Sequence, residues 1–199
     1  MNSNKIPLRT ITLVGLIILA AFSRIIPHIP NFSPLGAIGV FGVAHFSKKW
    51  LGILIPITAT WLSDLFINNV IYAKYTTSFV WFYDGFYWQY GSYILIAIAA
   101  HFILKKVNVK TVLFSAISST LIFFLVSNFG VWVSSNMYPH TFSGLMICYA
   151  MGVPFTSGTL LTGSLLGGSF LGNLFYNAVL FGSFALAQKQ IPALSIAKV

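Results

Sequence analysis

Residues 111–133, TVLFSAISSTLIFFLVSNFGVWV, contain no charged side chain and decide the class of the fold. About 20 mainly apolar residues are enough for a helix to cross the hydrocarbon core of a bilayer. The rest of the chain has the same character, because apolar residues make up 57% of its 199 residues and charged residues only 7%. Soluble domains carry about a quarter charged residues. The sequence therefore predicts an all-α, polytopic bundle of membrane helices.

Six segments are predicted to cross the membrane, and together they form a single domain over residues 1–199. The second segment is barely half a bilayer long, so we expect it either to pack inside the bundle or to tilt in thinned lipid. Pro56 is expected to kink the third segment. The sixth segment is longer than one crossing requires, and is either tilted or broken in its glycine-rich first half. The predicted spans are residues 8–26, 34–47, 50–67, 88–104, 111–133 and 159–187.

A further apolar segment, residues 142–155, is short and has Pro154 near its end. Its length is below that of a membrane-crossing helix. We therefore expect an accessory segment that is either re-entrant or interfacial.

The lysines and arginines predict the orientation of the spans. With the N-terminus placed in the cytoplasm, nine of the eleven basic residues fall on the cytoplasmic side, as the positive-inside rule requires. Only Arg24 and Lys74 fall outside. We expect a multi-pass membrane protein with both termini in the cytoplasm. The nine cytoplasmic residues are Lys5, Arg9, Lys48, Lys49, Lys105, Lys106, Lys110, Lys189 and Lys198.

Several function classes lack sequence support. The net charge of +9 does not indicate nucleic-acid binding, because the basic residues stand at the ends of apolar runs and suit anionic lipid headgroups instead. Cys148 is the only cysteine, and no two of the four histidines have the spacing that places two metal ligands on one helix face. No nucleophile elbow or phosphate-binding loop occurs. We predict no enzyme activity, no cofactor and no metal.

The two carboxylates, Asp64 and Asp84, are candidate functional residues because they are so rare in this chain. Arg24 and Asp64 stand near the outer ends of the first and third predicted spans. A charged side chain inside a membrane is costly, so we expect these two either to pair or to face a wet cavity. They either form a polar clamp for a ligand, with His28 nearby, or a structural ion pair. A third reading has Arg24 reaching to the lipid headgroups.

Residues 81–90, WFYDGFYWQY, hold seven aromatic residues around Asp84. Aromatic rings stack on flat heterocycles and attract cations, so this segment is a candidate lid over a binding site. The alternative is an ordinary interfacial belt of aromatic residues.

Asn128 and Trp132 are four residues apart and share one face of a predicted helix, where the amide needs either a second helix or a substrate as its partner. Together with the clamp and the aromatic segment, they complete a predicted pocket for a small-molecule ligand on the extracytoplasmic side. The pocket residues are Arg24, His28, Asn31, Asp64, Trp81, Asp84, Asn128 and Trp132.

The last predicted span contains two small-residue motifs, Gly163-x-x-x-Gly167 and Gly168-x-x-x-Gly172. This spacing permits close approach of helices, either within the protein or with a partner. Beyond them, Asn173 and Asn177 place two amides on one helix face. We expect these amides to link helices by hydrogen bonds rather than to bind substrate.

Four motifs form a distinctive series: RIIPHIPNFSP (24–34), LSD (62–64), SNFGVW (127–132) and NLFYNAVLFG (173–182). In this series the chain resembles a family of small, uncharacterised bacterial membrane proteins. That family is in turn similar to the substrate-binding S components of energy-coupling factor (ECF) vitamin transporters. The resemblance covers nearly the whole chain.

The resemblance implies a six-helix S-component bundle whose pocket opens to the outside. It also implies a separate membrane scaffold subunit and two cytoplasmic ATPases as partners, with the S component toppling to release its ligand. One feature departs from the pattern. The first span shows Gly15, Ala20 and Ala21 instead of the Ala-x-x-x-Ala face that S components commonly offer to the scaffold.

The sequence thus supports one leading function and two alternatives. The leading hypothesis is a membrane-embedded binding and uptake component for a vitamin-like or heterocyclic small molecule; a polar, aromatic pocket suits flavins, pterins, corrinoids and nucleosides equally. The first alternative is an ion- or proton-coupled carrier that uses Asp64. The second is a membrane scaffold that transports nothing.

Overall fold

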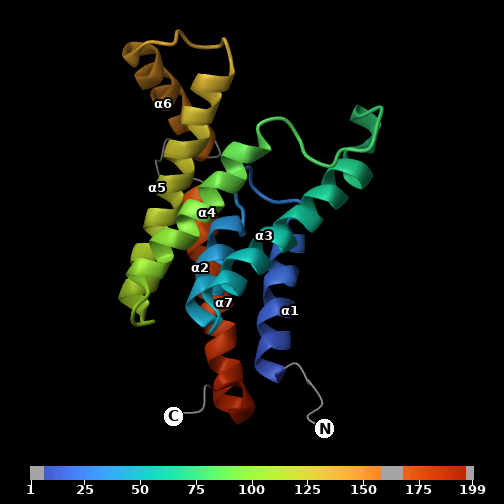
Figure 1. Ribbon diagram of the computed structural model, residues 1–199, viewed down its shortest axis with the longest axis vertical. Helices are drawn as coiled ribbons and strands as arrows, with labels where there is room; N and C mark the ends of the chain where they lie inside the picture. Colours follow the sequence, from blue (N-terminus) through green and yellow to red (C-terminus); the bar gives the residue numbers. More distant parts are fainter. Residues whose placement is uncertain (1–6, 158–167, 196–199) are drawn as a thin grey trace.

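In the computed structural model, residues 7–157 and 168–195 are described, and these residues form seven α-helices and no β-strand (Figure 1). The all-helical prediction is confirmed. Short 3₁₀ turns at Ser23–Ile25, Ala73–Tyr75 and Pro192–Leu194 and a π-helical turn at Ile67–Ile71 extend or connect the helices. The helices are α1 (Leu8–Phe22), α2 (Leu35–His45), α3 (Lys49–Phe66), α4 (Phe86–Ile103), α5 (Val109–Ser134), α6 (Phe142–Ser157) and α7 (Gly168–Gln190).

Four helical segments are long and apolar enough to cross a membrane. Among the described helices, α2 and α6 are apolar but shorter. Length and composition alone therefore support membrane insertion without establishing six crossings. The four segments are Leu8–Ile25, Lys49–Ile71, Val109–Ser134 and Gly168–Gln190.

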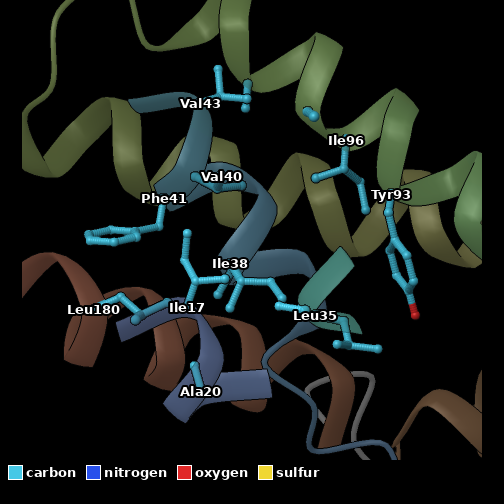
Figure 2. Close-up of a cluster of buried hydrophobic side chains, with 14 of the residues drawn as sticks. Ile17, Ala20, Leu35, Ile38, Val40, Phe41, Val43, Tyr93, Ile96 and Leu180 are labelled. Atoms are coloured by element: carbon cyan, nitrogen blue, oxygen red, sulfur yellow. The ribbon is translucent and has the colours of Figure 1, made fainter. Parts of the chain in front are cut away.

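The short helix α2 is the centre of the bundle. It packs against α1, α3, α4, α5 and α7, and Ile38, Val40 and Phe41 have no exposed surface. A helix that is apolar on all sides is expected to be buried. Figure 2 shows these side chains among Ile17 of α1 and Ile96 of α4. The sequence left two placements open for this segment, and the structure shows it packed inside the bundle.

Glycines allow α2 and α3 to cross at van der Waals distance. A Cβ atom added to Gly42 would lie 2.5 Å from the Gly52 carbonyl oxygen and 2.8 Å from Cγ of Pro56. A Cβ atom added to Gly52 would lie 2.7 Å from the Gly42 carbonyl oxygen. Real Cβ atoms do not come so close, so both positions require glycine.

Two helices, α6 and α7, follow one another along α5 (Figure 1). The Tyr149 hydroxyl of α6 donates to the Leu125 carbonyl oxygen at 3.1 Å, near the C-terminal end of α5. The Asn173 amide of α7 donates to the Ala116 carbonyl oxygen at 2.8 Å, nearer its N-terminal end. Residues 142–155 therefore lie in a helix beside α5. The predicted span 159–187 is described from residue 168 onward, and residues 159–167 lie outside the described part.

The two ends of the bundle differ in composition. At the end that we call the terminal end, Arg9 donates to the carbonyl oxygens of Leu194 at 2.5 Å and His45 at 3.0 Å, so both ends of the described chain meet there (Figure 1). The opposite end, which we call the aromatic end, carries residues 72–88 and 132–140. The described basic residues of the terminal end are Arg9, Lys48, Lys49, Lys105, Lys106, Lys110 and Lys189.

Candidate functional site

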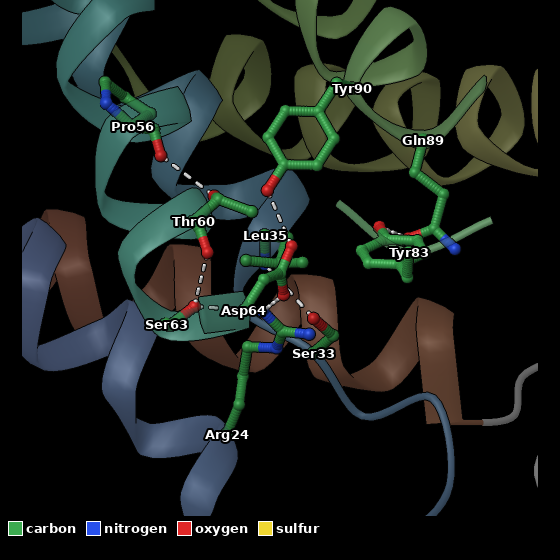
Figure 3. Close-up of polar contacts among 10 residues, drawn as sticks. All are labelled: Arg24, Ser33, Leu35, Pro56, Thr60, Ser63, Asp64, Tyr83, Gln89 and Tyr90. Atoms are coloured by element: carbon green, nitrogen blue, oxygen red, sulfur yellow. Dashed lines mark hydrogen bonds and ion pairs between the residues drawn. The ribbon is translucent and has the colours of Figure 1, made fainter. Parts of the chain in front are cut away.

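An ion pair between Arg24 and Asp64 joins α1 to α3 (Figure 3). Arg24 lies in the 3₁₀ turn that ends α1, and Asp64 lies in the last turn of α3. Nη1 of Arg24 is 2.6 Å from Oδ1 of Asp64 and donates a second hydrogen bond to the Ser63 hydroxyl at 3.0 Å. Asp64 is only 6% exposed. The sequence left open whether these two residues pair or face a wet cavity, and the structure shows the pair.

A tyrosine completes the shell around the Asp64 carboxylate. The Tyr90 hydroxyl of α4 donates to Oδ2 of Asp64 at 2.7 Å, so each carboxylate oxygen accepts a hydrogen bond from a different helix (Figure 3). A buried charge is tolerated when it is both paired and hydrogen-bonded. This cluster therefore fixes α1, α3 and α4 relative to one another.

Tyr83 lies just before α4, beside the cluster, and its hydroxyl donates to Oε1 of Gln89 at 2.8 Å. Burial, reinforced by the negative charge of Asp64, raises the pKa of the Tyr83 hydroxyl well above its ordinary value. Tyr83 therefore stays a neutral hydrogen-bond donor at physiological pH.

A cavity of about 420 Å³ opens next to the ion pair, and we call it the aromatic-end cavity. It extends from the loops of the aromatic end down to the middle of α5 and the first two turns of α7. Tyr93 and Phe123, whose rings stack at 5.8 Å with an interplanar angle of 8°, form one apolar part of its wall. Its polar lining residues are Arg24, His28, Asn31, Ser33, Gln89, Ser119, Thr120, Ser169 and Asn173.

The floor of this cavity is held by the Asn173 side chain. Its Nδ2 donates to the Ala116 carbonyl oxygen at 2.8 Å, to the Ser119 hydroxyl, and to the Thr120 hydroxyl at 3.0 Å. Asn177, one turn further along α7, donates to Oδ1 of Asn173 at 3.0 Å. The prediction that these amides link helices is confirmed for Asn173, which also lines the cavity.

The model of a family of unknown function, DUF6580, matches residues 4–194. The chain belongs to this family. No curated protein and no solved structure matches it. The seven described helices and the cavity of this DUF6580 protein all lie within the matched range, and the family description assigns no activity to them.

The predicted pocket residues of this DUF6580 protein fall into three groups. Arg24, His28 and Asn31 line the aromatic-end cavity, and Asp64 holds Arg24 in place. Asn128 lines a smaller neighbouring cavity of about 270 Å³, and Asn31 contributes to both cavities.

The remaining three predicted residues lie apart from both cavities. Trp81 is 60% exposed and stacks on Trp61 of α3, with the ring centroids 6.5 Å apart. Asp84 is exposed on the loop before α4. Trp132 donates to the Pro139 carbonyl oxygen at 2.9 Å. The structure thus places these side chains on the surface of the aromatic end.

The glycines at the start of α7 face the chain's own 30–33 segment. A Cβ atom added to Gly168 would clash with the Pro30 carbonyl oxygen, and one added to Gly172 would lie 2.9 Å from Cα of Phe32. Asn31, in the same segment, has a φ of 64°, a left-handed conformation that asparagine tolerates better than most residues. These two glycines therefore contribute to internal packing. Gly163 and Gly167 lie outside the described residues.

The cavity is equipped for binding. It offers imidazole, amide and hydroxyl groups beside stacked aromatic rings, and the Arg24 charge is balanced by Asp64. Among the described residues, no group of three or more His, Cys, Asp or Glu side chains is placed to hold a metal ion. Sequence reasoning missed Gln89, Ser119 and Thr120 as lining residues. Their only signal was a polar residue in an apolar helix.

Proposed function

We propose that this protein binds a compact heterocyclic molecule in the aromatic-end cavity and serves as a membrane component of its uptake. The observation that carries the proposal is the convergence of Arg24, His28 and Asn173 on one cavity with an aromatic wall. Small-molecule sites typically have volumes of about 300–1,000 Å³ and combine apolar walls with a few polar groups. The cavity has this size and composition.

The volume and charge of the cavity narrow the ligand class. About 420 Å³ suits a nucleoside, a pterin or a flavin ring system, whereas a corrinoid is much larger. The only carboxylate beside the cavity, Asp64, is already paired with Arg24, so the site favours neutral or weakly anionic ligands over cations. Flat rings match the aromatic wall.

We place the aromatic end outside the bacterial inner membrane and the terminal end in the cytoplasm. Seven of the nine described basic residues are at the terminal end, in accord with the positive-inside rule. Six passes follow if α6 and α7, which succeed one another along α5, share the last pass. The cavity then opens to the outside, as uptake requires.

The energy source of uptake is a separate proposal, which rests on the resemblance of the sequence to ECF S components. On this proposal, a membrane scaffold subunit and cytoplasmic ATPases supply the energy. The alternative of a non-transporting scaffold has less support, because Gly168 and Gly172 are used in internal packing. The alternative of a carrier that uses Asp64 predicts uptake that follows a pH gradient and is lost in Asp64→Asn.

A thermal screen of the purified protein against riboflavin, biopterin and guanosine tests the binding function. A ligand present at about 100 times its Kd stabilises the folded protein by about 2.7 kcal/mol, which raises its Tm measurably. Mass spectrometry of small molecules that co-purify with the protein widens the search. The binding function is wrong if no compound co-purifies and none of the three raises the Tm.

A matched pair of histidine variants locates the binding site. His28 lines the cavity, whereas His140 is exposed at the same end and lines none of the three described cavities. We expect His28→Ala to weaken binding about tenfold, or about 1.4 kcal/mol, and His140→Ala to bind normally. Equal affinities in the two variants would place the ligand elsewhere.

A further inference from the structure

A second, larger cavity of about 700 Å³ lies at the terminal end, between α5 and α7, and the proposed binding function does not use it. We call it the terminal-end cavity. Its walls are mainly apolar, with the rings of Phe181 and Phe184 on the α7 side. Polar groups occur at both of its limits: Asn177 in its depth, and Arg9 and Gln188 toward the end of the bundle.

Among the described residues that line this cavity, two buried polar side-chain atoms have no hydrogen-bond partner within the described part of the chain. They are Oδ1 of Asn177, whose residue is 2% exposed, and Nε2 of His45. Buried polar atoms are almost always satisfied, because leaving one without a partner costs free energy. These two atoms lie in residues that line the cavity, and they set this part of the bundle apart from an ordinary apolar core.

The linings of the two cavities approach one another along α5 and α7. Asn173 lines the aromatic-end cavity, and Asn177, four residues and about 6 Å further along α7, lines the terminal-end cavity. The two side chains are joined by the hydrogen bond from Asn177 Nδ2 to Asn173 Oδ1. On α5, Ser119 lines the first cavity and Ala116 the second. The Asn173 side chain, which donates to the Ala116 carbonyl oxygen of α5, therefore stands between the two linings.

We propose that the two cavities are the two halves of one passage through the bundle, closed at its middle by Asn173 and Asn177. This inference rests on the proposed uptake function and extends it. The ligand would cross within the protein, along α5 and α7, and its own N–H and O–H groups would replace the hydrogen bond between the two amides as it passes.

Cysteine accessibility tests the inner half without any knowledge of the ligand. Cys148 is the only cysteine, so Cys148→Ser gives a clean background. Gly182→Cys then places a thiol in the terminal-end cavity, where an added Cβ meets no atom within 4 Å. The control is Val179→Cys, at a residue of α7 that is 45% exposed and does not line the cavity. The probe is a membrane-impermeant methanethiosulfonate ammonium reagent, added to either side of sealed vesicles.

We expect Gly182→Cys to react at least tenfold faster than Val179→Cys, and only from the side of the terminal end. Ala185→Cys, in the same cavity, replaces Gly182→Cys if that variant does not accumulate. Equally slow reaction at the cavity and control positions would overturn the proposal, since the cavity would then be closed to water. So would reaction that proceeds equally fast from both sides.

The barrier is tested by adding Asn177→Ala to the Gly182→Cys variant. Loss of the amide should let reagent from the aromatic-end side reach the thiol at least tenfold faster. Asn177→Leu keeps the volume of the side chain and should block the reagent as the parent does. An unchanged rate in Asn177→Ala, or equal leakage through Asn177→Leu, would overturn the proposal. Because no ligand is used, a failed ligand screen refutes the binding function alone, and a failed accessibility test refutes the passage alone.

Discussion

The two ends of this bundle use charge in opposite ways. At the terminal end, the six described lysines are exposed and no described carboxylate stands beside them. At the aromatic end, Arg24 and Asp64 are turned inward and bonded to each other. Charges of the first kind interact with the surroundings of the protein, such as lipid headgroups. Charges of the second kind hold the helices together, so the exposed lysines serve orientation at one end and the Arg24–Asp64 pair serves architecture at the other.

The sharpest test of this comparison uses the two aspartates. Breaking a buried ion pair by removing one partner costs about 3–5 kcal/mol, because the other charge is left unpaired. We expect Asp64→Asn to lower the free energy of unfolding by about 3 kcal/mol, the lower end of this range, because Arg24 keeps some exposure. The Tm measured in detergent should fall accordingly. The exposed Asp84→Asn should leave the Tm unchanged. Similar losses in the two variants would remove the distinction between the two carboxylates.

The tyrosine that completes the cluster should have the next largest effect. Tyr90→Phe removes a hydrogen bond to a charged group, and such bonds contribute about 1.5–3 kcal/mol. Tyr87→Phe is the matched control, because its hydroxyl is only 3.3 Å from the Ser134 hydroxyl at an exposed site. Thermal unfolding of both variants measures the difference. A Tm of Tyr90→Phe equal to that of Tyr87→Phe would argue that the Asp64 carboxylate needs only Arg24.

Glycine substitutions test how far the part of the bundle toward the terminal end depends on close packing. Gly42 lies at the crowded crossing of α2 and α3, whereas Gly15 lies where there is open space. Gly42→Ala forces a Cβ against the backbone of α3 and should cost about 1–3 kcal/mol by overpacking. Gly15→Ala, in α1, meets no atom within 4 Å and should stabilise its helix by up to about 1 kcal/mol. Opposite shifts in the Tm of the two variants are the expected result. An unchanged Tm in Gly42→Ala would mean that α2 and α3 can move apart without loss of stability.

The smallest effect on stability is expected from the exposed lysines. Replacing Lys105 and Lys106 with Gln should change the free energy of unfolding by less than about 0.5 kcal/mol, as for most surface substitutions. The same change should increase the fraction of chains inserted in the wrong orientation, measured by labelling of an added terminal tag. A large fall in Tm with unchanged orientation would contradict the role that we assign to these charges.

The sequence was sufficient to predict helices apolar enough to cross a membrane, because this follows from local composition. For Arg24 with Asp64 and for the α2 segment, the sequence limited the arrangement to a few alternatives, and the structure decided among them. The residues that line the aromatic-end cavity could not all be predicted from the sequence. Helices such as α5 are apolar on all sides, so periodicity does not reveal which face Ser119 and Thr120 occupy.

The aromatic segment 81–90 illustrates the same limit. Density of aromatic residues cannot distinguish a lid from a surface belt, since both use the same side chains. The outcome depended on one long-range contact, the stacking of Trp81 on Trp61, which lies 20 residues earlier in the chain. Tyr90 of the same segment turned inward instead and reached Asp64. Whether an aromatic side chain of this segment faces outward, as Trp81 does, or inward, as Tyr90 does, depends on how the chain packs in the assembled bundle.

The contact between Arg24 and Asp64 also sets an order of events in biogenesis. The two residues are 40 positions apart, and Tyr90 follows Asp64 by 26 more. When α1 enters the bilayer, its arginine has no carboxylate to meet, and its long side chain reaches the headgroups instead. Only the insertion of α3 lets the guanidinium leave the interface, and α4 then seals the carboxylate. A nascent chain halted before α3 would therefore keep the Arg24 guanidinium at the headgroups, without its carboxylate partner.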